Sequence, residues 1–344
     1  MKVSLKKGRI LMKKYLLPES GNFYKANLHC HTTVSDGSMT PEEVKAHYMA
    51  NGYSIIAYTD HDVFLDRSDL AEEGFLPLNG FEAEIDEDSG KPRGYGKTCH
   101  ICFVAKDPGN LTIPFYHRSA YLFGNGEQYR DQMRFDETQP DYIREYTPEC
   151  VNDMIRRGKE AGFFVTYNHP VWSLEDYSDY MAYEGMDAME IMNYGCWIEG
   201  YMEYNPKVYD DMLRGGKRIY ALSTDDNHSK KDTCGGWIMV KAEKLEYAAV
   251  MQALEKGEFY SSWGPEIREL WFEDGYVHVK TSEARRIVCN YSKRKARCTE
   301  NSDGTPVTEA TFPVTDDCGY FRITVMDAQG RCADTNACFV DDLR

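Results

Sequence analysis

The sequence of 344 residues predicts an α/β protein with a β/α barrel of about seven strands and a small antiparallel β domain after it. From residue 23 to about 262, apolar strand-like runs alternate with helical segments, which is typical of a parallel sheet covered by helices. Several runs end in His, Asp or Glu, and β/α barrels carry their active sites at the carboxyl ends of the strands. After Trp263 the runs become short and alternating, with turn sequences between them.

The elements of the first domain follow from this pattern. The strands are expected in the apolar runs 26–31, 54–60, 75–84, 100–104, 163–169, 188–192 and 218–224. The helices are expected at about 41–51, 148–161, 206–214 and 245–256. The first helix has a clear start, because Thr40 suits the N-cap, Pro41 suits the first helical position and Glu43 completes a capping box.

Three segments depart from the alternation. Residues 1–22 form a basic N-terminal arm, expected to be solvated or an edge strand. Residues 106–147 are an inserted segment with three prolines, which predicts either a lid or substrate loop or a surface subdomain that only packs. Residues 263–344 contain short runs and turns such as Glu273-Asp274-Gly275. We expect them to form a β-sandwich that packs or dimerises, without chemistry of its own.

Charge and cysteine content restrict the partners and the compartment. The formal net charge of −16 argues against a general nucleic-acid or membrane binder. It allows an anionic small molecule, because bound metal ions reverse the local sign. The 11 irregularly spaced cysteines, without a signal peptide, favour free thiols and a cytoplasmic location. The expected partner is a small, anionic substrate, and a homo-oligomer is left open.

The histidines suggest a metal centre. His29 and His31 stand two residues apart at the end of an apolar run, and Asp36 follows. On a strand, residues i and i+2 face the same side, so the two imidazoles are expected to point together and form a cation site with a carboxylate. Further histidines lie at the edges of expected strands rather than on helix surfaces, namely His61, His100, His169 and His228.

The ordered motifs resemble those of the PHP (polymerase and histidinol phosphatase) metallohydrolases. They are HxH with a following Asp, Thr59-Asp60-His61-Asp62, Gly80-x-Glu82, the strand-edge His100, Asn168-His169-Pro170 and Asp226-x-His228. This resemblance covers about residues 23–262. A looser resemblance to the two-domain branch, which includes carbaryl-hydrolase-like enzymes, rests on Gly257-x-Phe259-Tyr260, Trp263-Gly264-Pro265 and Gly319-Tyr320-Phe321-Arg322.

The resemblance implies a distorted seven-stranded β/α barrel with a trinuclear metal centre, and we expect two to three divalent transition-metal ions. The implied ligands are His29, His31, Glu82 and Asp226 for one ion; Glu82 as a bridge with His100 and His169 for the second; and Asp36, His61 and His228 for the third. Imidazole and carboxylate ligands suit Zn, Mn or Fe. Glu84 lies on the same strand face as Glu82 and could replace it as the bridge, although the spacing after Gly80 favours Glu82.

The implied activity is hydrolysis of a small phosphate ester by a metal-bridged hydroxide. The alternatives are hydrolysis of a carboxylic ester, carbamate or amide at the same centre, and a metal-binding accessory domain without turnover. Asp60, Asp62 and Asp225 have no ligand role in this scheme, and each is expected to orient a histidine or to be a surface acid. Asp60, next to a ligand, is the candidate catalytic residue.

The inserted segment supplies the candidate substrate-binding residues, His117 and Arg118. An Arg guanidinium presents a planar fork that matches two oxygens of an anion. The alternative for Arg118 is an ordinary surface salt bridge. If Arg118 proves to be only that, the next candidates follow later strand ends and are Trp172, Asn193 and Trp197.

Overall fold

The computed structural model describes residues 13–90, 92 and 94–343. They form two compact units. The larger comprises Ser20–Gly264 and Asp334–Asn336, and the smaller comprises the described residues up to Glu19, Pro265–Ala333 and those from Ala337 onward. Residues 1–12 of the predicted arm lie outside the described part. Further along it, β1 (Lys14–Tyr15) pairs antiparallel with β13 (Ile267–Glu273) at the edge of a sheet.

The helices of the larger unit agree closely with the expected ranges. Those described are α1 (Pro41–Ala50), α2 (Pro148–Glu160), α3 (Tyr177–Ala182), α4 (Tyr194–Glu199), α5 (Pro206–Arg214) and α6 (Tyr247–Lys256). The capping box at the start of α1 is confirmed, since the Glu43 N–H donates to Thr40 Oγ1 and the Thr40 N–H donates to the Glu43 carboxylate. The short helices α3 and α4 were not expected.

The larger unit is built on a mixed sheet. Its strands are β2 (Asn22–Asn27), β3 (Ile55–Tyr58), β4 (Leu76–Asp86), β5 (Thr98–Ala105), β8 (Phe163–Tyr167), β9 (Ala188–Asn193), β10 (Tyr220–Thr224), β11 (Trp237–Ala242) and β12 (Phe259–Ser262), in the spatial order β10-β9-β8-β5-β4-β3-β2-β11-β12. Neighbours pair in parallel along β2-β3-β4 and β8-β9-β10. β5 runs antiparallel to both β4 and β8, and β11 runs antiparallel to β2 and β12.

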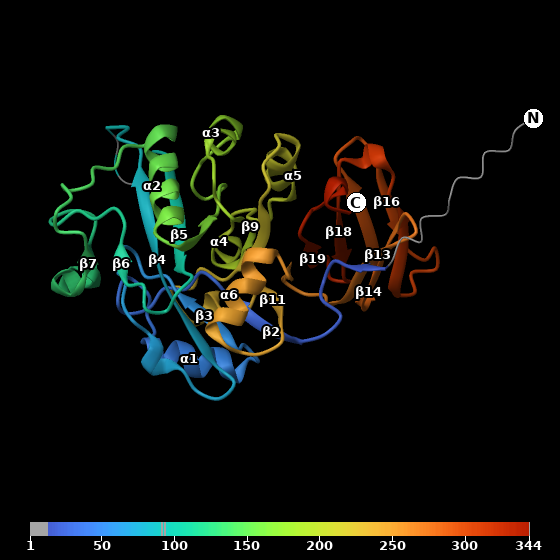
Figure 1. Ribbon diagram of the computed structural model, residues 1–344, viewed down its shortest axis with the longest axis horizontal. Helices are drawn as coiled ribbons and strands as arrows, with labels where there is room; N and C mark the ends of the chain where they lie inside the picture. The colour runs from blue at the N-terminus through green and yellow to red at the C-terminus, as the bar shows by residue number, and fades with distance from the viewer. Residues whose placement is uncertain (1–12, 91, 93, 344) are drawn as a thin grey trace, which may run out of the picture. The chain divides into compact units, whose positions relative to one another are not determined.

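Two fold expectations therefore need correction. The sheet is not all parallel, because an apolar run shows that a strand is buried but not the direction in which it runs. The described strands also do not close a barrel: β10 lies near β11 and β12, but no ladder joins them. A mixed α/β fold with a large central sheet is what the structure shows. Figure 1 shows α6 beside β11, with which it has contacts, and α2 has contacts to β8.

The inserted segment is ordered by short elements of its own. It contains β6 (Thr112–Ile113) and β7 (Arg134–Phe135), which pair in parallel, and a 3₁₀ helix, η2 (Gly124–Gln132). Near its end, Arg144 forms a buried ion pair with Asp62 and donates to the Glu84 carbonyl at 2.9 Å. The segment is thus tied to residues that flank His61 and Glu82.

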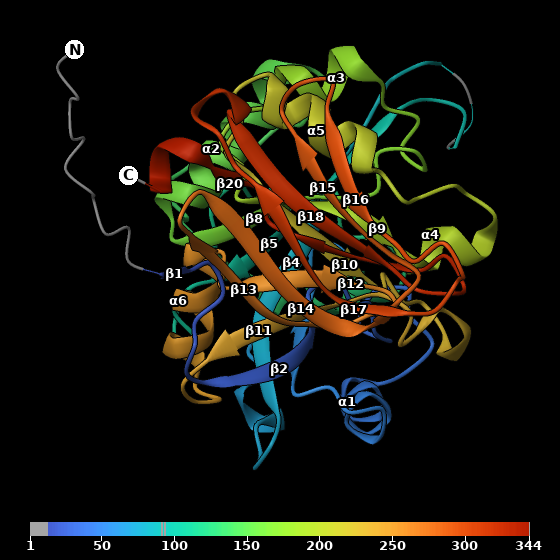
Figure 2. The same cartoon turned by 90° about the vertical axis from the view of Figure 1, so that its right-hand side faces the viewer.

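The smaller unit contains two antiparallel sheets (Figure 2). One consists of β1, β13, β14 (Tyr276–Ala284) and β17 (Val307–Pro313). The other includes β15 (Arg286–Tyr291), β16 (Ala296–Thr299), β18 (Tyr320–Met326) and β20 (Cys338–Phe339). β19 (Cys332–Thr335) begins in this unit. That these sheets pack as a sandwich stays a prediction. No helix within the described ranges is long and apolar enough to cross a bilayer.

Candidate metal centre

His29 and His31 lie just beyond β2, which ends at Asn27 rather than at residue 31 as expected. The Asn27 side chain fixes the turn, accepting from the His29 N–H at 3.3 Å and donating to the His29 carbonyl at 2.9 Å. The His31 N–H then donates to the Asn227 carbonyl at 3.2 Å. The two rings do point together, and their Nε2 atoms lie 3.0 Å apart.

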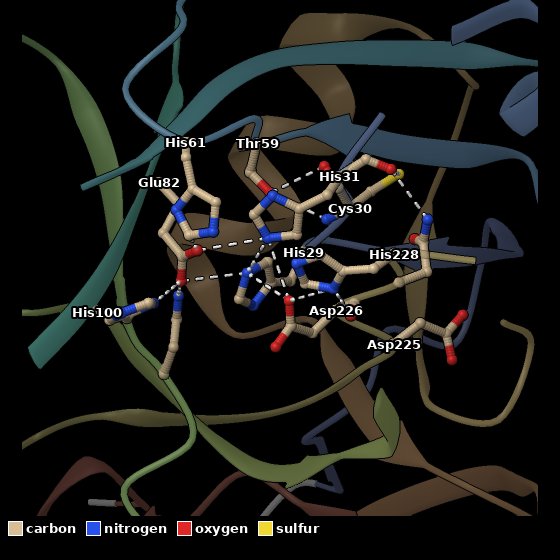
Figure 3. Close-up of polar contacts among 12 residues, drawn as sticks. His29, Cys30, His31, Thr59, His61, Glu82, His100, Asp225, Asp226 and His228 are labelled. Carbon is tan, nitrogen blue, oxygen red and sulfur yellow. Dashed lines mark hydrogen bonds and ion pairs between the residues drawn. The ribbon is translucent and has the colours of Figure 1, made fainter. Parts of the chain in front are cut away.

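The structure gathers all nine sequence-predicted ligands at one place, at or near the ends of β2, β3, β8 and β10 and along β4 and β5. Figure 3 labels seven of them: His29, His31, His61, Glu82, His100, Asp226 and His228. His29 Nε2 lies 3.1 Å from both Glu82 Oε1 and Asp226 Oδ1. His31 Nε2 lies 3.1 Å from Asp226 Oδ1 and 3.3 Å from Glu82 Oε2. The His61 and His100 Nδ1 atoms are each 3.3 Å from Glu82 oxygens.

The donor atoms fit a metal centre. Four buried atoms in the cluster have no hydrogen-bond partner, namely His31 Nδ1, His61 Nδ1, Glu82 Oε2 and His100 Nδ1. Leaving such an atom unpaired costs about 1–3 kcal/mol, and coordination to a cation removes that cost. Two ligand atoms about 2.1 Å from one ion at an angle near 90–110° are about 3.0–3.4 Å apart. The distances around Glu82 and Asp226 match this spacing.

The clusters overlap in a way that differs from the sequence-based grouping. The groups of atoms that converge are His29-His31-Glu82, His29-His169-Asp226, His61-Glu82-His100 and His31-Asp36-His61-His228. His61, rather than His169, therefore joins Glu82 and His100. His169 Nε2 is farther from Glu82 Oε1, at 3.6 Å, and 3.7 Å from Asp226 Oδ2.

Glu82 and Glu84 occupy different places on the same face of β4. The β4–β5 register sets Glu82 opposite Cys102 and Glu84 opposite His100. The Glu82 carboxylate is buried among five histidines, whereas Glu84 belongs to none of the converging clusters and lines the cavity outside them. Glu84 Oε2 is 3.6 Å from His100 Nε2. The geometry favours Glu82 as the bridging carboxylate.

Charge within the cluster keeps its carboxylates ionised. Burial alone would raise the pKa of Glu82, but the surrounding histidines, above all His29 and His100, hold it well below its ordinary value. The same balance lowers the pKa of Asp226. Burial lowers the pKa of His61, with His31 adding to the effect, so that its ring stays neutral. Burial opposes protonation of His29 and His31, but Asp226 and Glu82 beside them raise the pKa of both rings well above the ordinary value. Metal ions bind ionised carboxylates and neutral imidazoles, so metal binding at these two rings would release protons.

The acids without a ligand role have structural partners. Asp60 accepts hydrogen bonds from the Thr32 N–H and side chain, from Ser35 Oγ at 2.9 Å and from Arg67 at 3.3 Å. Asp225 accepts from Tyr48 and from backbone N–H groups of residues 234–236, and Figure 3 shows it pointing away from the rings. A catalytic role for Asp60 stays a prediction, and its contacts favour a role in holding the loop after His31.

Neither candidate substrate-binding residue in the inserted segment faces the cluster. Arg118 pairs with Asp141 at 2.6 Å and donates to the Glu137 and Gln139 carbonyls. It lines a different cavity, formed by the insertion and α2. His117 Nδ1 accepts from the N–H groups of Ser119 and Ala120. The structure thus favours the salt-bridge interpretation of Arg118.

A cavity of about 500 Å³ opens onto the candidate ligands. Apart from the ligands, its lining includes aromatic and apolar side chains: Phe123, Trp172, Leu174 and Tyr201. The Trp172 ring packs edge-on against His100 and His169, at 5.2 and 5.0 Å between centroids. The Phe123 ring lies 5.5 Å from that of His61. Of the remaining candidates, Asn193 donates to Asp226, and Trp197 packs against Trp263.

Sequence reasoning missed two groups next to the ligands. Glu190, on β9, is fully buried and its Oε1 lies 2.7 Å from His29 Nδ1. The Asn168 side chain donates to Glu82 Oε1 at 2.7 Å. Glu190 stands within the apolar run 188–192, and a lone carboxylate in such a run is the signal that could have revealed it, because charged side chains are almost never fully buried without partners.

No family model matches the chain. A 5'-3' exoribonuclease of Haemophilus influenzae (strain ATCC 51907 / DSM 11121 / KW20 / Rd) is 37% identical over 62 residues, which are 17% of this chain and only 23% of that protein. Among solved structures, a two-domain protein from Bacteroides vulgatus ATCC 8482, containing a predicted PHP-like metal-dependent phosphoesterase, is 16% identical with a TM-score of 0.47, over 93% of this chain and 96% of that one.

Two more solved structures are similar over the larger part of the chain. A protein from Bifidobacterium adolescentis ATCC 15703, for which metal-dependent phosphoesterase activity is inferred, is 17% identical, with a TM-score of 0.37 over 62% of this chain and 90% of that one. An amidohydrolase from Chromobacterium violaceum is 16% identical, with a TM-score of 0.41 over 68% and 96%.

Proposed function

We propose that the chain is a metal-dependent hydrolase that acts on a small phosphate ester. The observation that carries this proposal is the buried cluster of six histidines and three carboxylates, with unpaired ring nitrogens and metal-like spacing. Two to three divalent ions, Zn, Mn or Fe, suit this donor set. The proposed ligands are His29, His31, Asp36, His61, Glu82, His100, His169, Asp226 and His228.

Bound divalent ions supply Lewis acidity toward an ester oxygen and lower the pKa of water. The protein's own part is to hold the donors and shape the cavity. Glu82 and Asp226 are buried, ionised and central to the cluster, so that they can neutralise more than one cation. Trp172 and Phe123 stand beside ligand rings and are placed to contact the organic part of a substrate. Asp60 positions the loop after His31.

The cavity also favours a second candidate function, hydrolysis of a carboxylic ester, carbamate or amide at the same centre. Among the described residues that line it, none is Lys or Arg. A phosphate group usually meets such a side chain, whereas an uncharged ester needs only an apolar wall and an electrophilic metal. A comparison of both substrate classes decides between the two.

The proposal extends to the organisation of the chain. We assign the catalytic domain to residues 23–262, with 106–147 as an insertion, the arm to residues 1–22, and a β-sandwich without chemistry to residues 263–344. All proposed ligands precede residue 229. The proposed setting is the cytoplasm, with a small anionic substrate and no nucleic-acid or membrane partner.

The first test is elemental analysis of the purified protein, followed by phosphate release and ester hydrolysis with Zn, Mn and Fe. The screen should include single-stranded RNA with a 5'-phosphate. We expect two to three ions per chain, and His31→Ala should lower that number and abolish turnover, because His31 belongs to two of the clusters. His278→Ala is the matched control, since His278 is in the smaller unit and bonds Thr311. If the fully loaded wild-type protein binds at most one ion per chain, the proposal of a multinuclear centre is contradicted.

A further inference from the structure

Glu190 makes contacts that no ligand role explains. Its side chain is fully buried on β9, yet the carboxylate accepts four hydrogen bonds. Oε1 faces His29 Nδ1 at 2.7 Å and accepts from Thr224 Oγ1 at 2.6 Å. Oε2 accepts from the His169 N–H at 3.0 Å and from Asn193 Nδ2 at 2.9 Å. Both oxygens are therefore saturated, and none of their lone pairs is left for a cation.

Three of these four hydrogen bonds connect Glu190 to a proposed metal ligand, two of them directly and one through the Asn193 amide. A carboxylate only accepts, so His29 donates its Nδ1–H to Glu190, and this bond holds the ring with Nε2 facing the cluster. The bond to the His169 N–H fixes the backbone where that residue adopts the positive φ of 23°. The Asn193 amide, which donates to Glu190, also donates to Asp226 Oδ2 at 3.1 Å.

We propose that Glu190 is the positioning residue that sets His29, His169 and Asp226 in their metal-binding arrangement. This inference rests on the proposed metal centre, but it concerns a residue outside it. The three ligands come from distant parts of the chain, after β2, β8 and β10. A single buried carboxylate on β9, the strand between β8 and β10, joins all three. Orienting partners of this kind typically contribute ten- to a hundredfold to metal affinity.

Glu190→Gln tests the proposal with little change in shape. In either orientation of the amide, its NH2 group replaces one carboxylate oxygen that accepts two hydrogen bonds. An N–H donor then faces either the donors of His29 and Thr224 or those of His169 and Asn193. The matched control is Glu203→Gln. Glu203 is equally buried and accepts from the Val171 N–H, the Trp172 N–H and Asn205, but makes no hydrogen bond to a proposed ligand.

A second matched pair varies one contact. Thr224→Ser keeps the hydroxyl that donates to Glu190 Oε1, and Thr224→Val removes it. The readouts are metal affinity by competition with a chelator, the visible absorption spectrum of the Co²⁺-loaded protein, and the thermal unfolding midpoint of the metal-free protein. The first two report on ligand geometry, and the third reports on general damage to the fold.

We expect Glu190→Gln to lower metal affinity ten- to a hundredfold and to change the Co²⁺ spectrum, while Glu203→Gln lowers only the unfolding midpoint. The metal affinity of Thr224→Val should lie between those of Glu190→Gln and the wild type, and the metal affinity of Thr224→Ser should match that of the wild type. The inference is overturned if Glu190→Gln binds Co²⁺ with wild-type affinity and spectrum, or if Glu203→Gln alters both as strongly. A wild type that binds no metal would instead overturn the proposed function.

Discussion

The properties of the centre depend on how individual side chains are held. His61 illustrates this, because both of its ring nitrogens face carboxylates: Nδ1 lies 3.3 Å from Glu82 and Nε2 lies 3.7 Å from Asp36. One imidazole therefore stands between two clusters. Arg118 shows the opposite case, a charged side chain whose donors are already taken by Asp141 and two carbonyl groups. Residue type alone does not separate these cases, but the contacts do.

Substrate contact is therefore predicted for Trp172 rather than Arg118. Trp172→Ala should lower kcat/KM about tenfold or more, because truncation removes a cavity wall that packs on His100 and His169. Arg118→Ala should leave kcat/KM and metal content unchanged, since an exposed ion pair contributes at most about 1 kcal/mol. Steady-state kinetics on the best substrate, with metal content measured in parallel, checks both. Equal losses in the two variants would contradict this assignment.

Glu175 predicts a pH dependence of stability. Three tyrosine hydroxyls, from Tyr146, Tyr167 and Tyr183, enclose its carboxylate, and burial raises its pKa to about 7. The folded state thus holds this proton more tightly than the unfolded chain does. The resulting stabilisation is complete below the unfolded pKa near 4.5 and is lost as the pH rises through about 7.

Glu175→Gln, which stays neutral, should therefore gain stability relative to the wild type as the pH rises from 4.5 to 8, by on the order of 2 kcal/mol. Urea unfolding of both metal-free proteins at several pH values measures the difference. Comparing the two proteins at each pH cancels the titration of the histidine cluster. A difference that stays constant over this range would show that the Glu175 carboxylate does not titrate as argued.

At the scale of elements, the centre is assembled from chain segments that leave their strands in constrained conformations. Asp62, His169 and Asp226 all have positive φ values, of 54°, 23° and 51°. Such conformations cost about 1–3 kcal/mol each for residues other than glycine, and they persist only where surrounding contacts fix them. Close packing of α4 against the loop after β10 supplies one such contact, since the Gly195 N–H donates to the Asp225 carbonyl at 2.8 Å.

Gly195→Ala should therefore disturb Asp226. A Cβ at this position would lie 2.8 Å from the carbonyl oxygens of both Asp225 and Asp226, closer than real Cβ atoms approach backbone. We expect a loss of about 1–3 kcal/mol in the free energy of unfolding, together with weaker metal binding. Gly109→Ala is the control, because the nearest group there is the Asp107 side chain. Unchanged metal affinity in Gly195→Ala would show that the loop can shift without cost.

At the scale of the whole molecule, the sequence predicts some features of the chain and misses others for physical reasons. The sequence already carries the resemblance that implies the ligand set, because HxH and Asp-x-His stand at the ends of apolar runs and in the order typical of the PHP family. The direction of β5 cannot be predicted, because an apolar strand has the same residue pattern whether it runs parallel or antiparallel to its neighbours. The sequence leaves Arg118 open between substrate binding and a salt bridge, because the residue with which it pairs, Asp141, lies 23 residues away along the chain. Local sequence cannot reveal pairing over that distance.

The return of the chain from the smaller unit to the larger one is another long-range feature that the sequence does not reveal. Residues Asp334–Asn336 belong to the larger unit although they follow most of the smaller one. Asn336 Oδ1 accepts from the Ala221 N–H at 2.9 Å, and its Nδ2 donates to the carbonyls of Gly257 and Phe259 at 3.1 and 3.0 Å. A single side chain thus joins the start of β10 to the segment around β12.

Asn336→Ala should lower the free energy of unfolding by about 2–3 kcal/mol, because a backbone donor and two carbonyls lose their partner at once. Metal content and the Co²⁺ spectrum should not change, since Ala221 lies at the start of β10, away from the end that leads to Asp226, and Gly257 and Phe259 lie just before and at the start of β12, which carries no proposed ligand. Asn301→Ala is the matched control: its amide bonds only within the exposed loop 301–306. Urea unfolding monitored by tyrosine and tryptophan fluorescence measures the effect. If Asn336→Ala unfolds at the wild-type midpoint, residues 334–336 do not stabilise the larger unit.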